Sequence, residues 1–93
     1  MSAVDGQGQP ITEIGGYTVL LVESQGEWPK LSFTKEGTPP TIFGIGFLRH
    51  VPANLMVLGE FCANLRKLLG YQTEQINELT DWARRNVRLI YDT

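Results

Sequence analysis

The sequence of 93 residues is long enough for one domain with a small hydrophobic core. Its 42% apolar and 19% charged residues are typical of a globular domain and exclude a disordered or fibrous chain. The net charge of −2, from 8 basic and 10 acidic residues, is too balanced for a protein that binds nucleic acid in general.

Cysteine and histidine are too few for a built metal site. A single cysteine, Cys62, excludes an internal disulfide, and together with the lone His50 it cannot complete a structural zinc site. We therefore expect no metal and no other cofactor. The first ten residues lack the basic and apolar regions of a signal peptide, and no apolar run reaches about 18 residues, so a cytoplasmic location is expected.

The first half of the chain has the pattern of strands. Residues 1–12 are rich in Gly, Gln and Pro and predict a flexible tail before a single domain at 13–93. Residues 16–24 carry apolar side chains on both faces, as a central strand does. Residues 27–35 alternate from the lysine onward, as a half-buried antiparallel strand does, and residues 41–48 predict the third strand.

The second half changes to a helical period. Residues 52–69 predict a helix with Pro52 in its first turn and Gly70 just beyond its end. After a loop of about three residues, Thr73 is expected to cap a second helix. The expected buried stripes are Leu55, Leu58, Cys62, Leu65 and Leu69 on the first helix, and Ile76, Leu79, Ala83, Val87 and Ile90 on the second.

These elements predict an α+β fold of the order β-β-β-α-α. A three-stranded antiparallel meander is followed by an antiparallel helical hairpin, which we expect to pack on one face of the sheet. The apolar arc of the first helix is wide, and its residues Met56, Val57 and Leu68 are left without a partner in this arrangement. The helix is therefore either a central one, with the second helix of the same chain close to Gly59 and Ala63, or half of an interface with a second chain.

The stretch FGIGFLRH at 43–50 allows three interpretations. A phosphate loop needs three glycines in the spacing G-x-G-x-x-G, but Arg49 stands where the third should follow Gly44 and Gly46. A strand that bends at its glycines fits better, and a contact surface for another chain is the third possibility. In the strand, both glycines and Leu48 lie on the outer face, and the inward side chains are Phe43, Ile45 and Phe47.

Nucleophilic or acid–base catalysis has little support in the sequence. His50 is the one side chain expected to titrate near neutral pH, but no nucleophile motif accompanies it. A single histidine where a strand leads into a helix is more often a surface or capping residue. Cys62 lies in the apolar arc of the first helix and is expected to be a buried hydrophobe.

The second helix offers two further interpretations. Trp82 and Leu89, with Arg85 at the rim, form either an extension of the core or an exposed patch that binds a partner. Alternatively Arg84, Arg85 and Arg88, with Lys67 of the first helix, bind nucleic acid. Acidic residues precede these arginines on the same face, and Asp81 is placed to pair with Arg84 or Arg85, which favours a solvated surface.

We therefore expect a small module that binds proteins and is not an enzyme. It is expected to form a homodimer and to bind an unidentified protein as an adaptor, inhibitor or regulator. The alternative is a regulator that binds nucleic acid through Arg84, Arg85, Arg88 and Lys67. The candidate residues of the protein interface are Trp82, Arg85, Leu89, Met56, Gly44 and Gly46.

Overall fold

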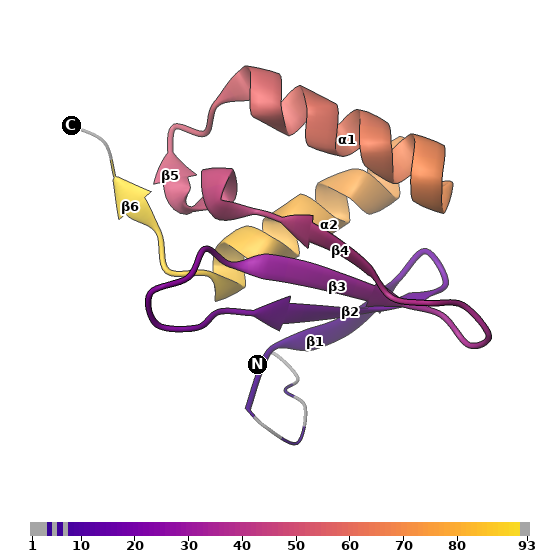
Figure 1. Ribbon diagram of the computed structural model, residues 1–93. Coiled ribbons are helices and arrows are strands. Elements are labelled where there is room, and N and C mark those ends of the chain that lie inside the picture. The colour runs from indigo at the N-terminus through magenta and orange to yellow at the C-terminus, as the bar shows by residue number, and fades with distance from the viewer. Residues whose placement is uncertain (1–3, 5, 7, 92–93) are drawn as a thin grey trace. The chain divides into compact units, whose positions relative to one another are not determined.

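The chain forms two compact units, Met1–Gly46 and Phe47–Thr93. The computed structural model describes residues 4, 6 and 8–91, with residue 91 described by its backbone alone, so part of the expected tail lies outside the described residues. The first unit is built from strands and the second mainly from helices (Figure 1). The predicted α+β class is confirmed, because an antiparallel sheet of four strands precedes two helices.

The sheet of the first unit holds one strand more than the three that were predicted. It consists of β1 (Ile11–Ile14), β2 (Tyr17–Val22), β3 (Lys30–Thr34) and β4 (Thr41–Gly44) in the order β1-β2-β3-β4. Each strand pairs with its neighbours antiparallel, so the sheet is a simple meander. The central strands β2 and β3 lie within the predicted strands at 16–24 and 27–35.

The additional strand β1 takes in the last two residues of the segment expected to be a tail. Ile11 pairs with Leu20, and the two-residue turn between the strands is Gly15–Gly16, both with positive φ (64° and 83°). A Gly-Gly pair between two strands is a recognised hairpin signal, because both turn positions need positive φ. The sequence therefore contained the signal for β1, but the strand is only four residues long.

One face of the sheet carries the buried side chains of the central strands. Val19 and Leu21 of β2 lie opposite Phe33 and Leu31 of β3, and all four are fully or almost fully buried. The alternation predicted from the lysine onward in residues 27–35 is confirmed, because Leu31 and Phe33 are buried and the residues between and beside them are not. Phe33 also meets Phe43 of β4 edge to face, with ring centroids 5.5 Å apart. Such aromatic pairs add about 0.5–1.5 kcal/mol to the free energy of burial.

The predicted third strand is too long, because β4 ends at Gly44. The amide of Ile45 still donates to the carbonyl of Pro29, at 2.9 Å, but residues 46–49 then form the 3₁₀ helix η1 (Gly46–Arg49). The expected placement of Leu48 on the outer face is wrong, since its side chain is fully buried. A strand pattern of alternating apolar residues cannot show where non-local hydrogen bonding stops.

The first helix of the second unit, α1 (Leu55–Leu69), begins three residues later than expected. Its start is set by Asn54, whose side-chain oxygen accepts from the amides of Met56 (3.0 Å) and Val57 (3.3 Å). Pro52 lies before this cap, outside the helix. Its end is the predicted one, because Gly70 adopts the left-handed conformation with φ 71°.

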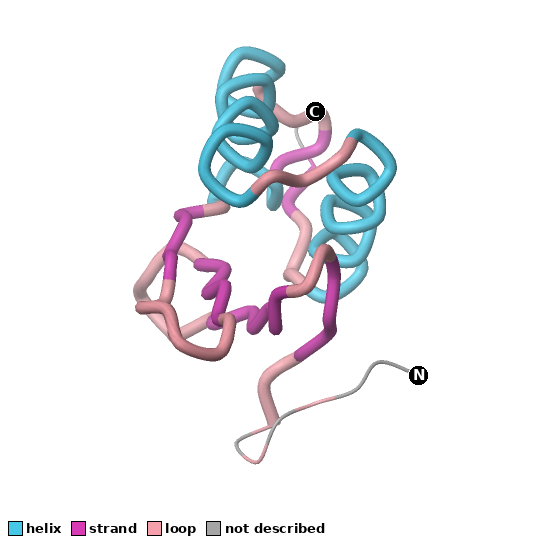
Figure 2. The backbone as a smooth tube through the Cα atoms, turned by 90° about the vertical axis from the view of Figure 1, so that its right-hand side faces the viewer, coloured by secondary structure: helices cyan, strands magenta, loops and turns pink. Residues whose placement is uncertain are grey.

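The second helix, α2 (Thr73–Asn86), runs back in roughly the opposite direction (Figure 1), and a short loop joins the two helices (Figure 2). Its cap is Gln72 and not Thr73, since the Gln72 amide donates to the side chain of Gln75 at 2.8 Å. Four of its five predicted stripe residues are buried, and the fifth, Ile90, lies beyond the helix and is partly exposed.

A short parallel pair of strands joins the two ends of the second unit. The strands β5 (His50–Val51) and β6 (Ile90–Tyr91) flank the two helices in sequence. Beside them, Nε of Arg49 donates to the backbone carbonyl of Arg88 at 3.0 Å. The helical hairpin is therefore closed at its base by backbone pairing and by one arginine.

Candidate protein-interaction surface

The helix α1 has one buried apolar face and one exposed apolar face. Phe61 and Leu65 are buried, and the ring of Phe61 meets that of Phe47 edge to face with centroids 5.5 Å apart. Leu55 and Met56 are each 79% exposed, and Leu68 is 59% exposed. The predicted burial of Leu55 is therefore wrong, because contacts around Phe61 orient the helix differently from its leucine pattern.

The exposed residues near the start of α1 form a continuous stripe, which we call the α1 stripe and define as Leu55, Met56, Gly59 and Ala63. All four are exposed. Leu55, Gly59 and Ala63 follow one another at intervals of four, and Met56 stands beside them, so they share one side of the helix. Large apolar side chains at one end and small residues in the middle make this side both apolar and closely approachable.

Charged residues border the α1 stripe. Glu60 and Lys67 are exposed and lie seven residues apart, which places them on the same flank of the helix. Neither has an opposite charge three or four residues away along α1. Arg66 lies seven residues after Gly59, on the same side of the helix as the stripe, and donates to the hydroxyl of Thr73 at 3.1 Å. The sequence signal for this surface was the adjacent pair Leu55 and Met56, which lie about 100° apart and cannot both face a narrow core.

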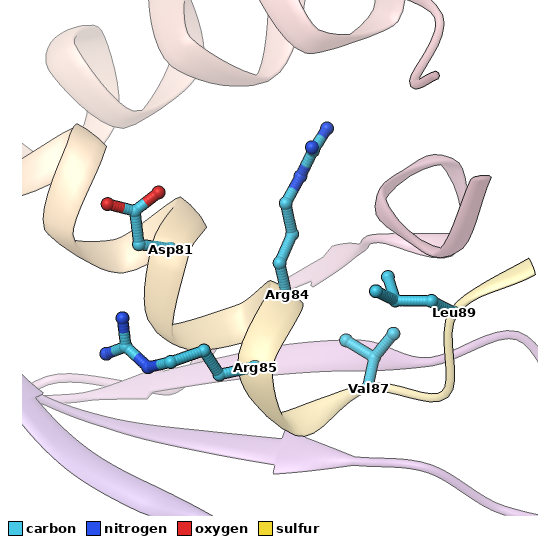
Figure 3. A pocket seen from close by; sticks show the side chains of 5 residues that line it. All are labelled: Asp81, Arg84, Arg85, Val87 and Leu89. Carbon is cyan, nitrogen blue, oxygen red and sulfur yellow. The ribbon is translucent and has the colours of Figure 1, made fainter. Parts of the chain in front are cut away.

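The residues predicted as an interface on α2 are not together on the surface. Trp82 is only 7% exposed. Of the two interpretations of this residue, extension of the core and not an exposed patch is therefore the one that the structure supports. Arg85 is exposed and Leu89 is half-buried. These last two line a surface hollow of about 700 Å³ shown in Figure 3, together with Asp81, Arg84 and Val87.

A second hollow, of about 650 Å³, adjoins the first through Asp81 and Arg84. Its other walls come from residues 51–53, from Leu55 and Leu58 of α1, and from Thr80 of α2. Arg84 and Arg85 point in different directions in Figure 3, so the hollows do not bring two guanidinium groups onto one ligand. The expected ion pair of Asp81 with either arginine does not form among the described residues.

The two glycines of the FGIGFLRH stretch have different surroundings. Gly44 is exposed at the end of β4, and a Cβ atom there would meet nothing within 4 Å. Gly46 lies under Trp28, where a Cβ atom would come within 2.8 Å of the indole carbon Cε3. The glycines therefore do not form one open strip, and only Gly44 is available to a partner.

His50 and Cys62, the two side chains considered for chemistry, lie in separate elements. His50 pairs with Ile90 within the short parallel strands and is half-buried. Cys62 is a free, half-buried cysteine of α1. Neither lines the two hollows. Between residues 8 and 91 no three His, Cys, Asp or Glu side chains come together as metal ligands do.

The positive charge of the chain is unevenly divided. All five arginines stand in residues 47–93, the second unit. Of the four predicted nucleic-acid contacts, Arg85, Arg88 and Lys67 are exposed and Arg84 is half-buried. Lys67 belongs to α1 and the three arginines to the last turns of α2 and its end, so the set is spread over two elements.

Comparison with known proteins finds partial similarity to two proteins named as probable mitochondrial arginine–tRNA ligases. The probable mitochondrial arginine–tRNA ligase of Mus musculus is 35% identical over 77 residues, which cover 80% of this chain and 12% of the relative. The corresponding protein of Bos taurus is 34% identical over 77 residues with the same coverage. The chain thus matches about an eighth of the length of these curated relatives. No protein family and no solved structure matches the sequence.

Within the described part of the chain, neither α1 nor α2 is long and apolar enough to cross a membrane.

Proposed function

We propose that the protein is a non-enzymatic interaction module that binds another protein chain through the α1 stripe. The observation that carries this proposal is the 79% exposure of both Leu55 and Met56 on one helix. Burying such side chains contributes about 25 cal/mol for each Å² of apolar surface removed from water. Gly59 and Ala63 support the proposal because small residues let a partner's backbone or helix come close.

A photo-reactive amino acid placed at position 56 tests this function in cells of the source organism. We expect irradiation to link the protein covalently to a partner chain at this position. The matched control carries the same amino acid at Ile42, an apolar position on β4 of the first unit that is 62% exposed. Adducts in equal yield at both positions, or none at position 56, would contradict the proposal.

A second candidate function is RNA binding, as the sequence alternative suggests. It is supported by the partial similarity to enzymes named as tRNA ligases and by the gathering of all five arginines in the second unit. Arginine side chains bind phosphate groups through paired N–H donors. Arg84 lies in the last turn of α2, and Arg88 lies two residues beyond the end of this helix.

Fluorescence anisotropy with labelled tRNA tests this second function. The variant R84A/R88A is compared with K30A/K35A, which removes the same charge from the first unit. RNA binding through the second unit predicts a loss of affinity in R84A/R88A alone, and a dissociation constant that rises steeply with salt. Equal losses in both variants would indicate non-specific attraction and would exclude this function.

A cytoplasmic location remains part of the proposal. The two similar proteins are described as mitochondrial, so fractionation of source cells with an antibody against this chain distinguishes the two locations.

A further inference from the structure

We propose that the chain covering the α1 stripe is a second copy of this protein, and that the two α1 helices pair antiparallel about a two-fold axis near Ala63. This inference rests on the proposed function, because it names the partner of the same surface. The observations that carry it are the exposed stripe and the arrangement of charge along its border.

The charges along this border are complementary to themselves in one orientation only. Glu60 and Lys67 lie on the same flank of α1, about 10 Å apart along the axis. In a two-fold antiparallel pair, the same flank of each helix meets that of the other, and contacts are reciprocal. If the axis passes between residues 63 and 64, Glu60 of each copy faces Lys67 of the other. A parallel pair would set like charges level with each other.

The uncharged residues fit the same arrangement. Ala63 lies at the axis, and Gly59 lies a little more than one turn from it, so the two helices can approach closely where they cross. Met56 then lies level with Tyr71 of the second copy, two residues past the end of the partner helix at Leu69. Leu55 and Met56 therefore lie at the two outer ends of the contact, beside the residues that follow the partner helix. One helix from each copy makes a small interface, so an equilibrium between monomer and dimer is expected.

Charge exchange tests this arrangement by sedimentation velocity over a dilution series. In a homodimer of Glu60→Lys, or of Lys67→Glu, like charges face each other at both symmetric positions. Each single variant is therefore expected to raise the dissociation constant about tenfold. An equimolar mixture of the two variants is expected to associate as wild type does, because both positions then hold opposite charges. The double variant E60K/K67E is expected to recover in the same way.

A charge change elsewhere is the matched control. Glu78→Lys makes the same substitution at an exposed position of α2 and is expected to leave the dissociation constant unchanged. Recovery in the mixture identifies the antiparallel pair, since a merely structural effect of either substitution would persist in it.

Two results would overturn the inference. One is a wild-type chain that stays monomeric up to millimolar concentration, and the other is a dimer that neither single variant weakens. Either result leaves the cross-link at position 56 as a separate test of the proposed function, because that cross-link reports a partner of any identity.

Discussion

Trp28 lies across Gly46 at a distance that leaves no room for a side chain. A Cβ atom at position 46 would stand 2.8 Å from Cε3 of the indole and 3.1 Å from Cδ2. The indole is nevertheless 63% exposed, so the glycine supports one side of the ring while the rest meets solvent. The need for glycine here comes from this contact and not from the backbone, since the φ of Gly46 is not positive.

The first prediction concerns the two glycines of the FGIGFLRH stretch. Gly46→Ala is expected to displace the exposed ring of Trp28 and to lower the free energy of unfolding by about 1 kcal/mol, the low end of the cost of inserting a methyl group into a filled space. Gly44→Ala meets nothing within 4 Å and is expected to be neutral or to stabilise by about 0.5–1 kcal/mol. Urea unfolding of both variants measures the difference, and equal free energies would show that Trp28 moves aside without cost.

The second prediction concerns the glycines of α1. Gly70→Ala forces a side chain into a left-handed conformation with φ 71° and is expected to cost about 1 kcal/mol. Gly59→Ala lies inside the helix with open space around it and is expected to stabilise by about 0.5–1 kcal/mol.

The same Gly59→Ala variant separates folding from association. Its added methyl group stands at the centre of the α1 stripe, where it would hold two helices apart. We expect its melting temperature to rise and its self-association to weaken. If the melting temperature rises and self-association also becomes stronger, the partner binds to a surface other than the α1 stripe.

The third prediction concerns the start of α1. Asn54→Ala removes the acceptor for the amides of Met56 and Val57 and is expected to lower the free energy of unfolding by about 1 kcal/mol. Asn54→Asp retains an acceptor at the same place and favours the helix dipole, so stability should return to the wild-type level or above. Thermal unfolding followed by circular dichroism gives both values. If Asn54→Asp is as unstable as Asn54→Ala, the cap has been wrongly assigned.

The fourth prediction compares the two tryptophans. Trp82→Ala empties a buried site and is expected to cost about 3–5 kcal/mol, enough to unfold a marginal domain, whereas Trp82→Phe should remain folded with a smaller loss. Trp28→Ala removes an exposed ring and is expected to cost about 1 kcal/mol or less. Chemical unfolding monitored by far-ultraviolet circular dichroism measures the free energy of unfolding of all three variants. A larger loss for Trp28→Ala than for Trp82→Ala would contradict the burial of Trp82.

The residue patterns were sufficient to predict the kinds of element and most of their positions. Alternation about Leu31 and Phe33 predicted β3, and the helical period with Gly70 at its end predicted α1. These signals are local, because the pleat of a strand and the turn of a helix depend on neighbouring residues. The stripe of α2 was predicted for the same reason, with four of its five residues buried.

The tertiary structure decided which faces are buried and where strands stop. A helical period shows which side chains lie together, but not which group meets the interior. The contact of Phe61 with Phe47, fourteen residues earlier in the chain, accompanies the burial of Phe61 while Leu55 stays in solvent. Likewise β4 ends where its pairing with β3 ends, so Leu48 turns inward from a 3₁₀ helix. Contacts between residues far apart in the chain determine which face of a helix or strand is buried. A local sequence pattern does not show these contacts.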